Sequence, residues 1–353
     1  MKLEAARLAP APVEVRRYAD ADRDAWTAFV AQCEQATLFH RIEWKAVMER
    51  VFGHRTHFLL ADQGGLVTGV LPLAEVYSRL FGHSLVSLPF CVYGGAAASS
   101  AAAAHALHAR ARELAADLNV SHLELRNRVP TEADWPRQDL YETFRKPLLA
   151  GEEDNFKALP GKRRNMIRKA EKAGLKAALD GSVDRFYRLY TRNVHRHGTP
   201  PVSRGYFEEV ARLLGSDHEV LTVTTADGQP LASAFLLYFR DEVCPYYVGD
   251  CDQARALAAN DYMYWEIIRR AAARGCRTFD WSRSKKGTGS YEFKKLWGFE
   301  PAQLHYEYAL LRRDSVPQNN PLNPKYRAMI AIWQRLPLPV VNAIGPRLVR
   351  SLG

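Results

Sequence analysis

One order of elements occurs twice in this sequence, and it constrains the fold more than any other feature. Each unit contains a hairpin with a tight turn, a further strand, a helix and a final strand. In the first half the two strands of the hairpin and the later helix and strand fall at 56–62, 66–76, 101–118 and 121–126. In the second half the corresponding segments, with the third strand included, fall at 219–225, 231–240, 242–249, 261–274 and 276–281. The units are offset by about 160 residues, a length expected of one domain. The pattern predicts an α/β fold with mixed sheets in two domains; a single large α/β sheet is the alternative.

The domain boundaries follow from the same pattern. We predict an N-terminal domain over 1–150, a C-terminal domain over 151–312 and a proline-rich extension over 313–353. The extension contains a possible short helix at 326–335, which would either pack against the first domain or lie on a membrane surface.

The second unit predicts where a ligand would bind. A strand, a helix and a strand in this order form a right-handed crossover between parallel strands, and ligands bind beyond the carboxyl ends of such strands. This places 249–260 and 282–290 at one mouth of the sheet. Pro245 lies inside the strand over 242–249, and since proline cannot donate to a strand ladder, we expect a bulge or a splayed strand there.

Charge and cysteine content narrow the function. The formal net charge of +10 favours an anionic partner such as nucleic acid, a phosphorylated substrate or an acidic membrane. The five cysteines form no CxxC pair, which argues against a disulfide framework and structural zinc and favours reduced thiols in the cytoplasm. No run approaches the roughly 18 apolar residues of a membrane span. We expect a cytoplasmic protein, and peripheral contact with the inner membrane stays open as an alternative.

A basic segment follows the first unit. On a helix that begins near Lys162, Arg164, Arg168 and Lys172 align at i, i+4 and i+8. Such a stripe is either a solvated surface or a phosphate-binding face for RNA or a sugar diphosphate. We treat these three residues as candidates for substrate binding.

The loop over 280–299 combines cations, glycines and aromatic residues at the carboxyl end of a strand. Phe293 and Lys294 are adjacent in the sequence, which predicts a lysine held beside an aromatic ring. Such a lysine stabilises a developing oxyanion without acting as a nucleophile. Acyl transfer to an amine needs that positive charge and no metal. A mobile loop with a surface lysine is the plainer alternative. Further substrate-binding candidates around the mouth are His195, His197, Thr199, Arg283, Lys285 and Tyr291, and Tyr247 is a candidate proton shuttle.

Several candidate sites have little support. His195 and His197 have no carboxylate nearby in the sequence, so a metal pair is not expected. There is no GxSxG elbow for a Ser–His–Asp triad and no HExxH metal motif.

Four groups of motifs carry a resemblance to a known family: 39–44 (Phe-His-Arg-Ile-Glu-Trp), 159–172, 197–200 (His-Gly-Thr-Pro) and 279–299. Over about residues 14–312 the chain resembles the FemAB-like transferases, whose fold has two tandem GNAT-like (N-acetyltransferase) domains. Within that family it looks like the subgroup found with exosortase/PEP-CTERM exopolysaccharide systems. Members of the family transfer an amino acid from aminoacyl-tRNA to an amine of a peptidoglycan precursor without a metal. The resemblance implies that Phe293 and Lys294 stabilise the tetrahedral intermediate.

The resemblance leaves the acyl donor open. Many members insert a coiled-coil arm thought to engage tRNA, and no heptad-rich insertion occurs here. Relatives that use acetyl-CoA carry a glycine-rich pyrophosphate loop, where this chain has Arg255-Ala-Leu-Ala-Ala-Asn260. Arg255 and Asn260 are therefore candidates for cofactor binding, with acyl-CoA and aminoacyl-tRNA both open as co-substrates.

The leading expectation is an acyl- or aminoacyl-transferase that forms an amide on an amino group of a cell-envelope or exopolysaccharide precursor. A phosphorylated or lipid-linked sugar would be the acceptor, and tRNA a further partner. The alternative is a non-catalytic protein that binds anionic glycan, lipid carrier or RNA on a degenerate GNAT fold.

Overall fold

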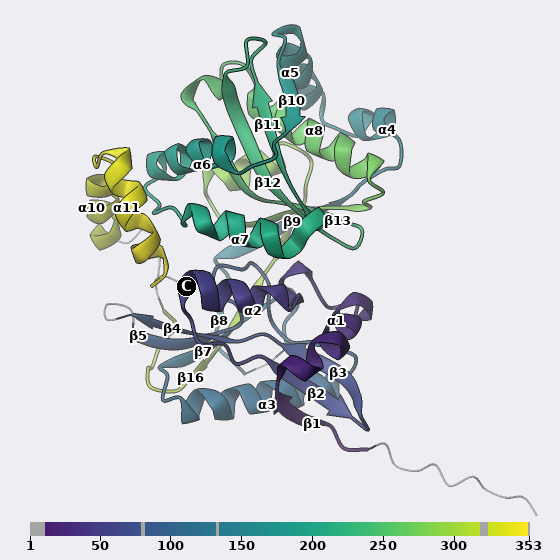
Figure 1. Cartoon of the computed structure of the whole chain (residues 1–353), viewed down its shortest axis with the longest axis vertical. Coiled ribbons are helices and arrows are strands. Elements are labelled where there is room, and N and C mark those ends of the chain that lie inside the picture. Colours follow the sequence, from purple (N-terminus) through teal and green to yellow (C-terminus); the bar gives the residue numbers. More distant parts are fainter. Residues whose placement is uncertain (1–10, 79–81, 132–133, 318–323, 352–353) are drawn as a thin grey trace, which may run out of the picture.

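The structure is a computed structural model that describes residues 11–78, 82–131, 134–317 and 324–351. Figure 1 shows two halves stacked along the long axis, with two C-terminal helices on one flank. No helix in the described ranges combines the length and the apolar character needed to cross a membrane.

In its described residues, the first half contains two sheets and three α-helices. Its helices are α1 (Arg23–Gln32), α2 (Glu43–Val47) and α3 (Ala101–Asp117). Its strands are β1 (Glu14–Arg17), β2 (Leu59–Gln63), β3 (Leu66–Leu71), β4 (Ala74–Ser78), β5 (Gly82–Val86), β6 (Ala97–Ala98), β7 (His122–Asn127) and β8 (Arg137–Gln138). The segment 66–76, expected to be one strand, is interrupted at Pro72 into β3 and β4, which belong to different sheets. Proline lacks the N–H that would continue the ladder.

The second half is built on one seven-stranded sheet. Its strands are β9 (Tyr141–Pro147), β10 (Lys176–Leu179), β11 (His218–Thr224), β12 (Pro230–Phe239), β13 (Glu242–Asp250), β14 (Thr278–Lys285) and β15 (Pro301–Gln303), and β16 (His305–Leu310) follows. Its helices are α4 (Glu152–Lys157), α5 (Gly161–Lys172), α6 (Asp184–Arg196), α7 (Arg204–Leu214), α8 (Ala259–Ala273) and α9 (Gly289–Lys295). The flanking helices are α10 (Pro324–Trp333) and α11 (Leu338–Val349).

The repeat predicted from the sequence is confirmed. In the first half β5 pairs with β7 in parallel across α3, and in the second half β13 pairs with β14 in parallel across α8. Each parallel pair joins only two residues of each strand before the strands part: Leu85 and Val86 with Leu123 and Glu124, and Glu242 and Val243 with Thr278 and Phe279. The expected irregularity at Pro245 is also present, because the register of β12 against β13 shifts between Phe235 and Leu236 and leaves Tyr246 bulged.

The two halves exchange strands. The strand β9, from the end of the first half, lies between β14 and β15 in the sheet of the second half. The strand β16, from the end of the second half, lies between β7 and β8 in a sheet of the first half. Boundaries drawn at 150 and 312 therefore do not coincide with the sheets, since hydrogen bonding assigns 141–147 and 305–310 to the opposite half.

Helices cover both faces of the large sheet. One face packs against α5 and α8 around Ile167, Met263, Ile267 and Trp297. The other face packs against α6, α7 and the first half in one continuous core that includes Trp44, Phe186, Phe207 and Phe235. Because this second core draws residues from both halves, their relative placement is part of the fold.

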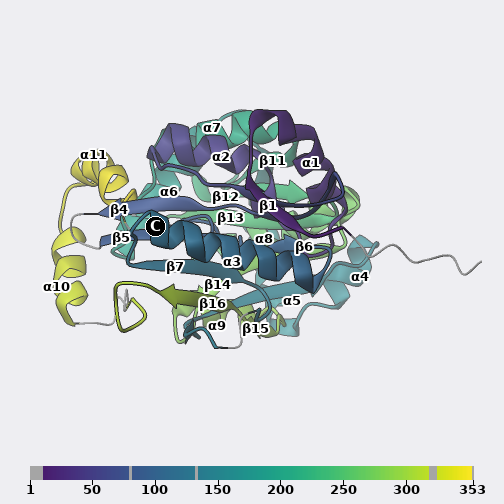
Figure 2. The same cartoon turned by 90° about the horizontal axis from the view of Figure 1, so that it is seen from below.

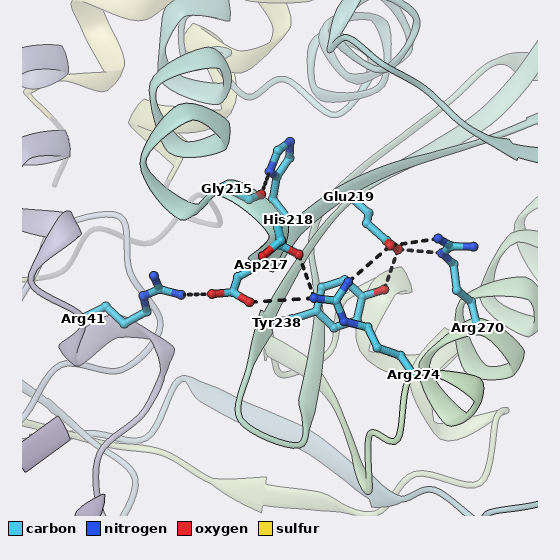
Figure 3. A network of polar contacts seen from close by, with 9 residues as sticks. Arg41, Gly215, Asp217, His218, Glu219, Tyr238, Arg270 and Arg274 are labelled. Atoms are coloured by element: carbon cyan, nitrogen blue, oxygen red, sulfur yellow. Dashed lines mark hydrogen bonds and ion pairs between the residues drawn. The ribbon is translucent and has the colours of Figure 1, made fainter. Parts of the chain in front are cut away.

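An ion-pair network reinforces the contact between the halves (Figure 3). Arg41 of the first half donates to Asp217 at 2.7 Å, and Arg274 lies 3.8 Å from the other oxygen of Asp217. Arg274 also contacts Glu219, which accepts hydrogen bonds from Arg270 and from the Tyr238 hydroxyl. Several charges share these contacts, so the network restricts the geometry more than a single surface pair would.

Candidate functional site

Lys294 is buried on α9 with its ammonium group against the backbone of β14. Its Nζ donates to the carbonyl oxygens of Trp281 at 2.6 Å, Ser282 at 3.1 Å and Arg283 at 3.2 Å. These carbonyls belong to a bulge of β14, where the register against β9 shifts between Asp280 and Arg283 and Ser282 adopts a φ of 62°. Lys294 therefore holds the bulge that sets the directions of the neighbouring side chains. It is not the surface lysine of a mobile loop.

Burial also changes the protonation of Lys294. Loss of water lowers its pKa to about 7, and the nearby Asp280 and Cys244 oppose that shift. The ring of Phe144 lies 5.4 Å from Nζ and adds an aromatic face. A lysine of this kind changes charge near neutral pH, which is the range in which proton transfer is efficient.

Phe293, the other half of the predicted pair, belongs to an aromatic cluster. Its ring lies 5.8 Å from Tyr264, 5.9 Å from Trp281 and 6.3 Å from Trp297. The guanidinium of Arg163 lies 5.9 Å from the Phe293 ring, and Arg163 pairs with Asp261 at 2.7 Å inside the protein. Phe293 therefore fixes α9 against α5 and α8, which positions Lys294.

A cavity of about 490 Å³ opens in the first half. It is lined by three segments, Glu34–His40, Tyr93–His105 and Arg126–Thr131, of which only some residues face it. The small side chains of Ala101 and Ala104 at the start of α3 leave it room. None of these residues was a candidate site residue in the sequence, because they come together only through the fold.

His40 shapes the floor of this cavity. Its Nδ1 accepts the Thr37 backbone N–H at 3.0 Å, so Nε2 carries the proton and donates to the Gly95 carbonyl at 2.7 Å. Burial lowers the pKa of His40 to about 4, so the ring is neutral at pH 7. His40 lies in the 39–44 motif that carries the family resemblance, which was the one sequence signal pointing to the cavity.

The loop on the other side of the cavity is held by a carboxylate from the far end of the chain. Glu307 of β16 is fully buried and accepts hydrogen bonds from Asn127 Nδ2 at 2.7 Å and from the Thr131 hydroxyl at 2.6 Å. It also accepts the Thr131 backbone N–H at 3.0 Å and Arg137 Nε at 3.1 Å. The exchanged strand β16 thus supports a wall of the cavity.

A second cavity lies where the two halves meet. Thr37, Phe39 and Tyr93 line it from the first half, and Glu242, Cys244 and Asp280 line it from β13 and β14. Thr37 and Tyr93 line both cavities, so the two are neighbours. Asp280 accepts hydrogen bonds from the Tyr93 hydroxyl at 3.2 Å and from the Ser282 backbone at 2.8 Å, and Arg145 contacts both Asp280 and Glu242. Burial raises the pKa of Glu242.

Arg283 and Tyr247 also lie between the halves. Arg283 donates to the Tyr306 hydroxyl at 2.8 Å and lies over the rings of Tyr141 and Tyr306, with no carboxylate within 4.0 Å in the described part of the chain. Tyr247 packs among Tyr190, Tyr206 and Phe207, and burial raises its pKa to about 12. A phenol with that pKa is a poor base at neutral pH, which weakens the proton-shuttle assignment.

The basic helix does not line either cavity. Arg164, Arg168 and Lys172 lie on α5, which Figure 1 places at the opposite end of the molecule from α1 and α3. Arg168 and Lys172 are exposed and Arg164 is half-buried. These three substrate-binding candidates therefore lie away from both cavities, because α5 packs on the outer face of the large sheet against α8.

The remaining predicted residues are spread over other surfaces. His195 Nε2 contacts the Trp333 carbonyl at 3.1 Å, so it holds the C-terminal helices, while His197 and Thr199 are exposed beside it. Tyr291 donates to Glu142 at 2.5 Å, and Lys285 is half-buried. Arg255 is exposed, and Asn260 donates to Asp250 at 2.7 Å. The structure does not bring these seven residues into one site.

Among the described residues, no group of three or more His, Cys, Asp or Glu side chains is arranged to hold a metal ion.

The cavity depends on a glycine. A Cβ at Gly95 would lie 1.6 Å from Asn127 Oδ1. We expect Gly95→Ala to displace Asn127, to narrow the cavity and to lower the free energy of unfolding by about 1–3 kcal/mol. Urea denaturation measures the loss. Gly181→Ala is the matched control, because no atom lies within 4 Å of its Cβ position, and it should leave stability within about 0.5 kcal/mol of the wild type. Equal behaviour of the two variants would contradict the assignment.

Comparison with known proteins gives the fold a name. Residues 161–295 match the family described as the acetyltransferase (GNAT) domain. A search of curated protein sequences gave no match. Among solved structures, the crystal structure of FemX matches with a TM-score of 0.64 and 15% identity, over 90% of this chain and 100% of that chain.

The chain has the GNAT fold.

Two further structures share this GNAT architecture. The C-terminal domain of a putative lysylphosphatidylglycerol synthetase from Agrobacterium fabrum matches with a TM-score of 0.55 and 13% identity, over 89% of this chain and 95% of that chain. A tandem GNAT protein from the clavulanic acid biosynthesis pathway matches with a TM-score of 0.51 and 14% identity, over 86% of this chain and 100% of that chain. At these identities the likeness concerns the GNAT fold, and the chemistry has to be argued from the site.

Proposed function

We propose that this chain is an N-acyltransferase or aminoacyltransferase that forms an amide on an amino group of a cell-envelope precursor. The observation that carries the proposal is the meeting of three features at one place. The parallel strands β13 and β14 part after two residue pairs, a buried lysine binds the bulge of β14 beside the gap, and the cavity of the first half adjoins a small one where the two halves meet. The larger cavity, of about 490 Å³, gives room for one substrate, whereas the second, of about 10 Å³, has room for no more than a water molecule in this structure.

The reaction requires few groups. The amine nitrogen attacks the acyl carbonyl carbon, the new C–N bond forms, and the bond to the thiol or hydroxyl of the donor breaks. One proton leaves the amine and one is gained by the leaving group. Lys294 is assigned to stabilise the oxyanion, with one of its carbonyl contacts exchanged for the reacting oxygen. Glu242 and Asp280 face the second cavity and are better placed than Tyr247 to accept the amine proton.

The substrates follow from charge and space. Arg283 lies between the halves without a carboxylate partner in the described chain, which suits an anionic group on the acceptor. A cavity of about 490 Å³ accommodates a sugar or short peptide portion of such a precursor. The exposed cations of α5 remain available to phosphates of the donor, whether acyl-CoA or aminoacyl-tRNA. We propose a phosphorylated or lipid-linked sugar of exopolysaccharide assembly as the acceptor.

Mass spectrometry tests the proposal. The full chain would be incubated with isotopically labelled aminoacyl-tRNA or acyl-CoA together with amino-sugar nucleotides and lipid-linked amino sugars. The expected product carries the labelled acyl mass in a linkage that resists hydroxylamine, as an amide does and an ester or thioester does not. Precursor binding without an amide product from either donor class would overturn the proposal and support a non-catalytic binding protein.

A further inference from the structure

The C-terminal helices α10 and α11 expose apolar side chains where a surface helix normally exposes polar ones. The large apolar residues concerned are Met329 (59% exposed), Ile332 (63%), Val340 (41%), Ile344 (36%) and Leu348 (44%). In α11 the exposed positions are Pro339, Val340, Ala343, Ile344, Arg347 and Leu348, of which only the arginine is polar. An ordinary amphipathic helix would place polar residues there.

The opposite faces of these helices are already bound to the protein. A Cβ at Gly345 would lie 2.5 Å from Pro201, and a Cβ at Gly198 would lie 2.3 Å from Ile330, so both contacts are close. Gln334 donates to the Arg196 carbonyl at 2.7 Å, and α11 packs against α6. Within the described residues, the helix expected at 326–335 contacts the second half through Ile330, Trp333 and Gln334, and not the first domain. Arg350, after α11, lies beside Gly53 of the first half. Figures 1 and 2 show both helices on one flank of the molecule.

The charge of this segment identifies what covers the apolar face. Between residues 315 and 353 the chain contains five Lys or Arg residues and no Asp or Glu. Arg335 and Arg347 are exposed, and neither contacts a carboxylate in the part of the chain that the structure describes. A face that combines exposed apolar residues with unpaired arginines matches the headgroup and acyl boundary of an anionic bilayer. A second protein copy would have to supply both apolar surface and carboxylates.

We propose that α10 and α11 form a docking surface for anionic phospholipid membranes, with Met329, Ile332, Val340, Ile344 and Leu348 inserted and Arg335 and Arg347 at the headgroups. The helices lie in the plane of the interface. The surface is separate from both cavities, so this inference does not depend on the proposed transfer reaction.

Vesicle flotation with the full chain tests the surface. The wild type should float with vesicles of phosphatidylcholine and phosphatidylglycerol at 3:1 and much less with phosphatidylcholine alone, and added salt should weaken the binding. The double variant Ile332→Asp/Leu348→Asp should lose at least tenfold in partition coefficient, because each aspartate removes an inserted side chain and adds repulsion. The double variant Arg335→Glu/Arg347→Glu should lower the partition coefficient about tenfold or more on anionic vesicles, and only on those.

The matched control is Leu66→Asp/Leu179→Asp, which changes two side chains of 72% and 42% exposure elsewhere on the molecule. It should bind like the wild type, and thermal melting of all variants should be unchanged because the altered side chains face solvent. Equal flotation of the control and the α10/α11 variants would overturn the proposal. A second result would also overturn it: the wild type forms a dimer in sedimentation velocity, Ile332→Asp/Leu348→Asp dissociates that dimer, and the wild type does not bind vesicles. A second copy of the chain would then cover the apolar face.

Discussion

Replacing Lys294 with methionine is expected to lower turnover by about 10²–10³-fold, the effect of losing one oxyanion donor. The loss should appear in kcat, since the ammonium is assigned to the transition state. The change also leaves the carbonyls of Trp281, Ser282 and Arg283 without their donor, which should lower the free energy of unfolding by about 1–3 kcal/mol. Steady-state kinetics of amide formation and urea denaturation measure the two effects.

The neighbouring Lys295 supplies the control. It follows Lys294 on α9 and is exposed, so Lys295→Met removes the same charge without touching the bulge. It should retain wild-type turnover and stability. If Lys294→Met loses stability while folded protein keeps its full kcat, Lys294 only supports β14 and the oxyanion assignment is wrong.

The same variant gives a pH signature. Since the pKa of Lys294 is about 7 in the folded protein and near 10.5 when exposed, the unfolded chain binds the extra proton between these values. Stability therefore gains from Lys294 as pH rises through this window, and its cost is greatest below pH 7. The difference in unfolding free energy between wild type and Lys294→Met should shift in favour of the wild type from pH 7 to pH 10. A constant difference would show that the three carbonyls compensate fully for the lost water.

The second large effect is expected at Glu307. Glu307→Ala removes the acceptor of Asn127, Thr131 and Arg137 from a fully buried position. We expect the free energy of unfolding to fall by about 3 kcal/mol, the lower end for breaking a buried ionic contact, because Arg137 is partly exposed and can turn to water. The loop over 127–131 should also become more sensitive to limited proteolysis, since its anchor is gone.

Glu300→Ala serves as the control for Glu307, because Glu300 is an exposed carboxylate five residues after Lys295 on the same stretch of chain. It should change stability by no more than about 0.5 kcal/mol. Glu307→Gln keeps the shape and should fall between the two. A Glu307→Ala protein as stable as Glu300→Ala would contradict the support of the cavity wall by β16.

Local features of this fold were predictable from the sequence. The hairpins, the two crossover helices and the irregularity at Pro245 follow from alternation, helical periodicity and the missing N–H of proline, which all act within a few residues. Helix α11 was not predicted, because the extension is rich in proline, which usually interrupts helices. The helix nevertheless forms: it begins with Leu338-Pro339, where proline is tolerated in the first turn, and it contains Pro346.

The site was less predictable, because it depends on contacts between distant segments. His40, Tyr93 and Asp280 are separated by most of the chain, and the cavity walls also depend on Glu307. The i, i+4 spacing on α5 correctly predicted a cationic face. Helical periodicity does not indicate which face of a sheet the helix covers. Arg163, which directly precedes the first stripe residue, is the buried cation of the segment and pairs with Asp261.

The exchange of β9 and β16 has a consequence for biosynthesis. As the chain emerges from the ribosome, β7 cannot pair with β16 until residue 310 has been translated. Almost all of the chain that follows β1 must therefore be made before this sheet is complete. A fragment ending near 150 lacks β16 and one beginning near 151 lacks β9, so gene fragments cut there should yield insoluble products, whereas co-expressed pieces divided within a surface turn should reassemble.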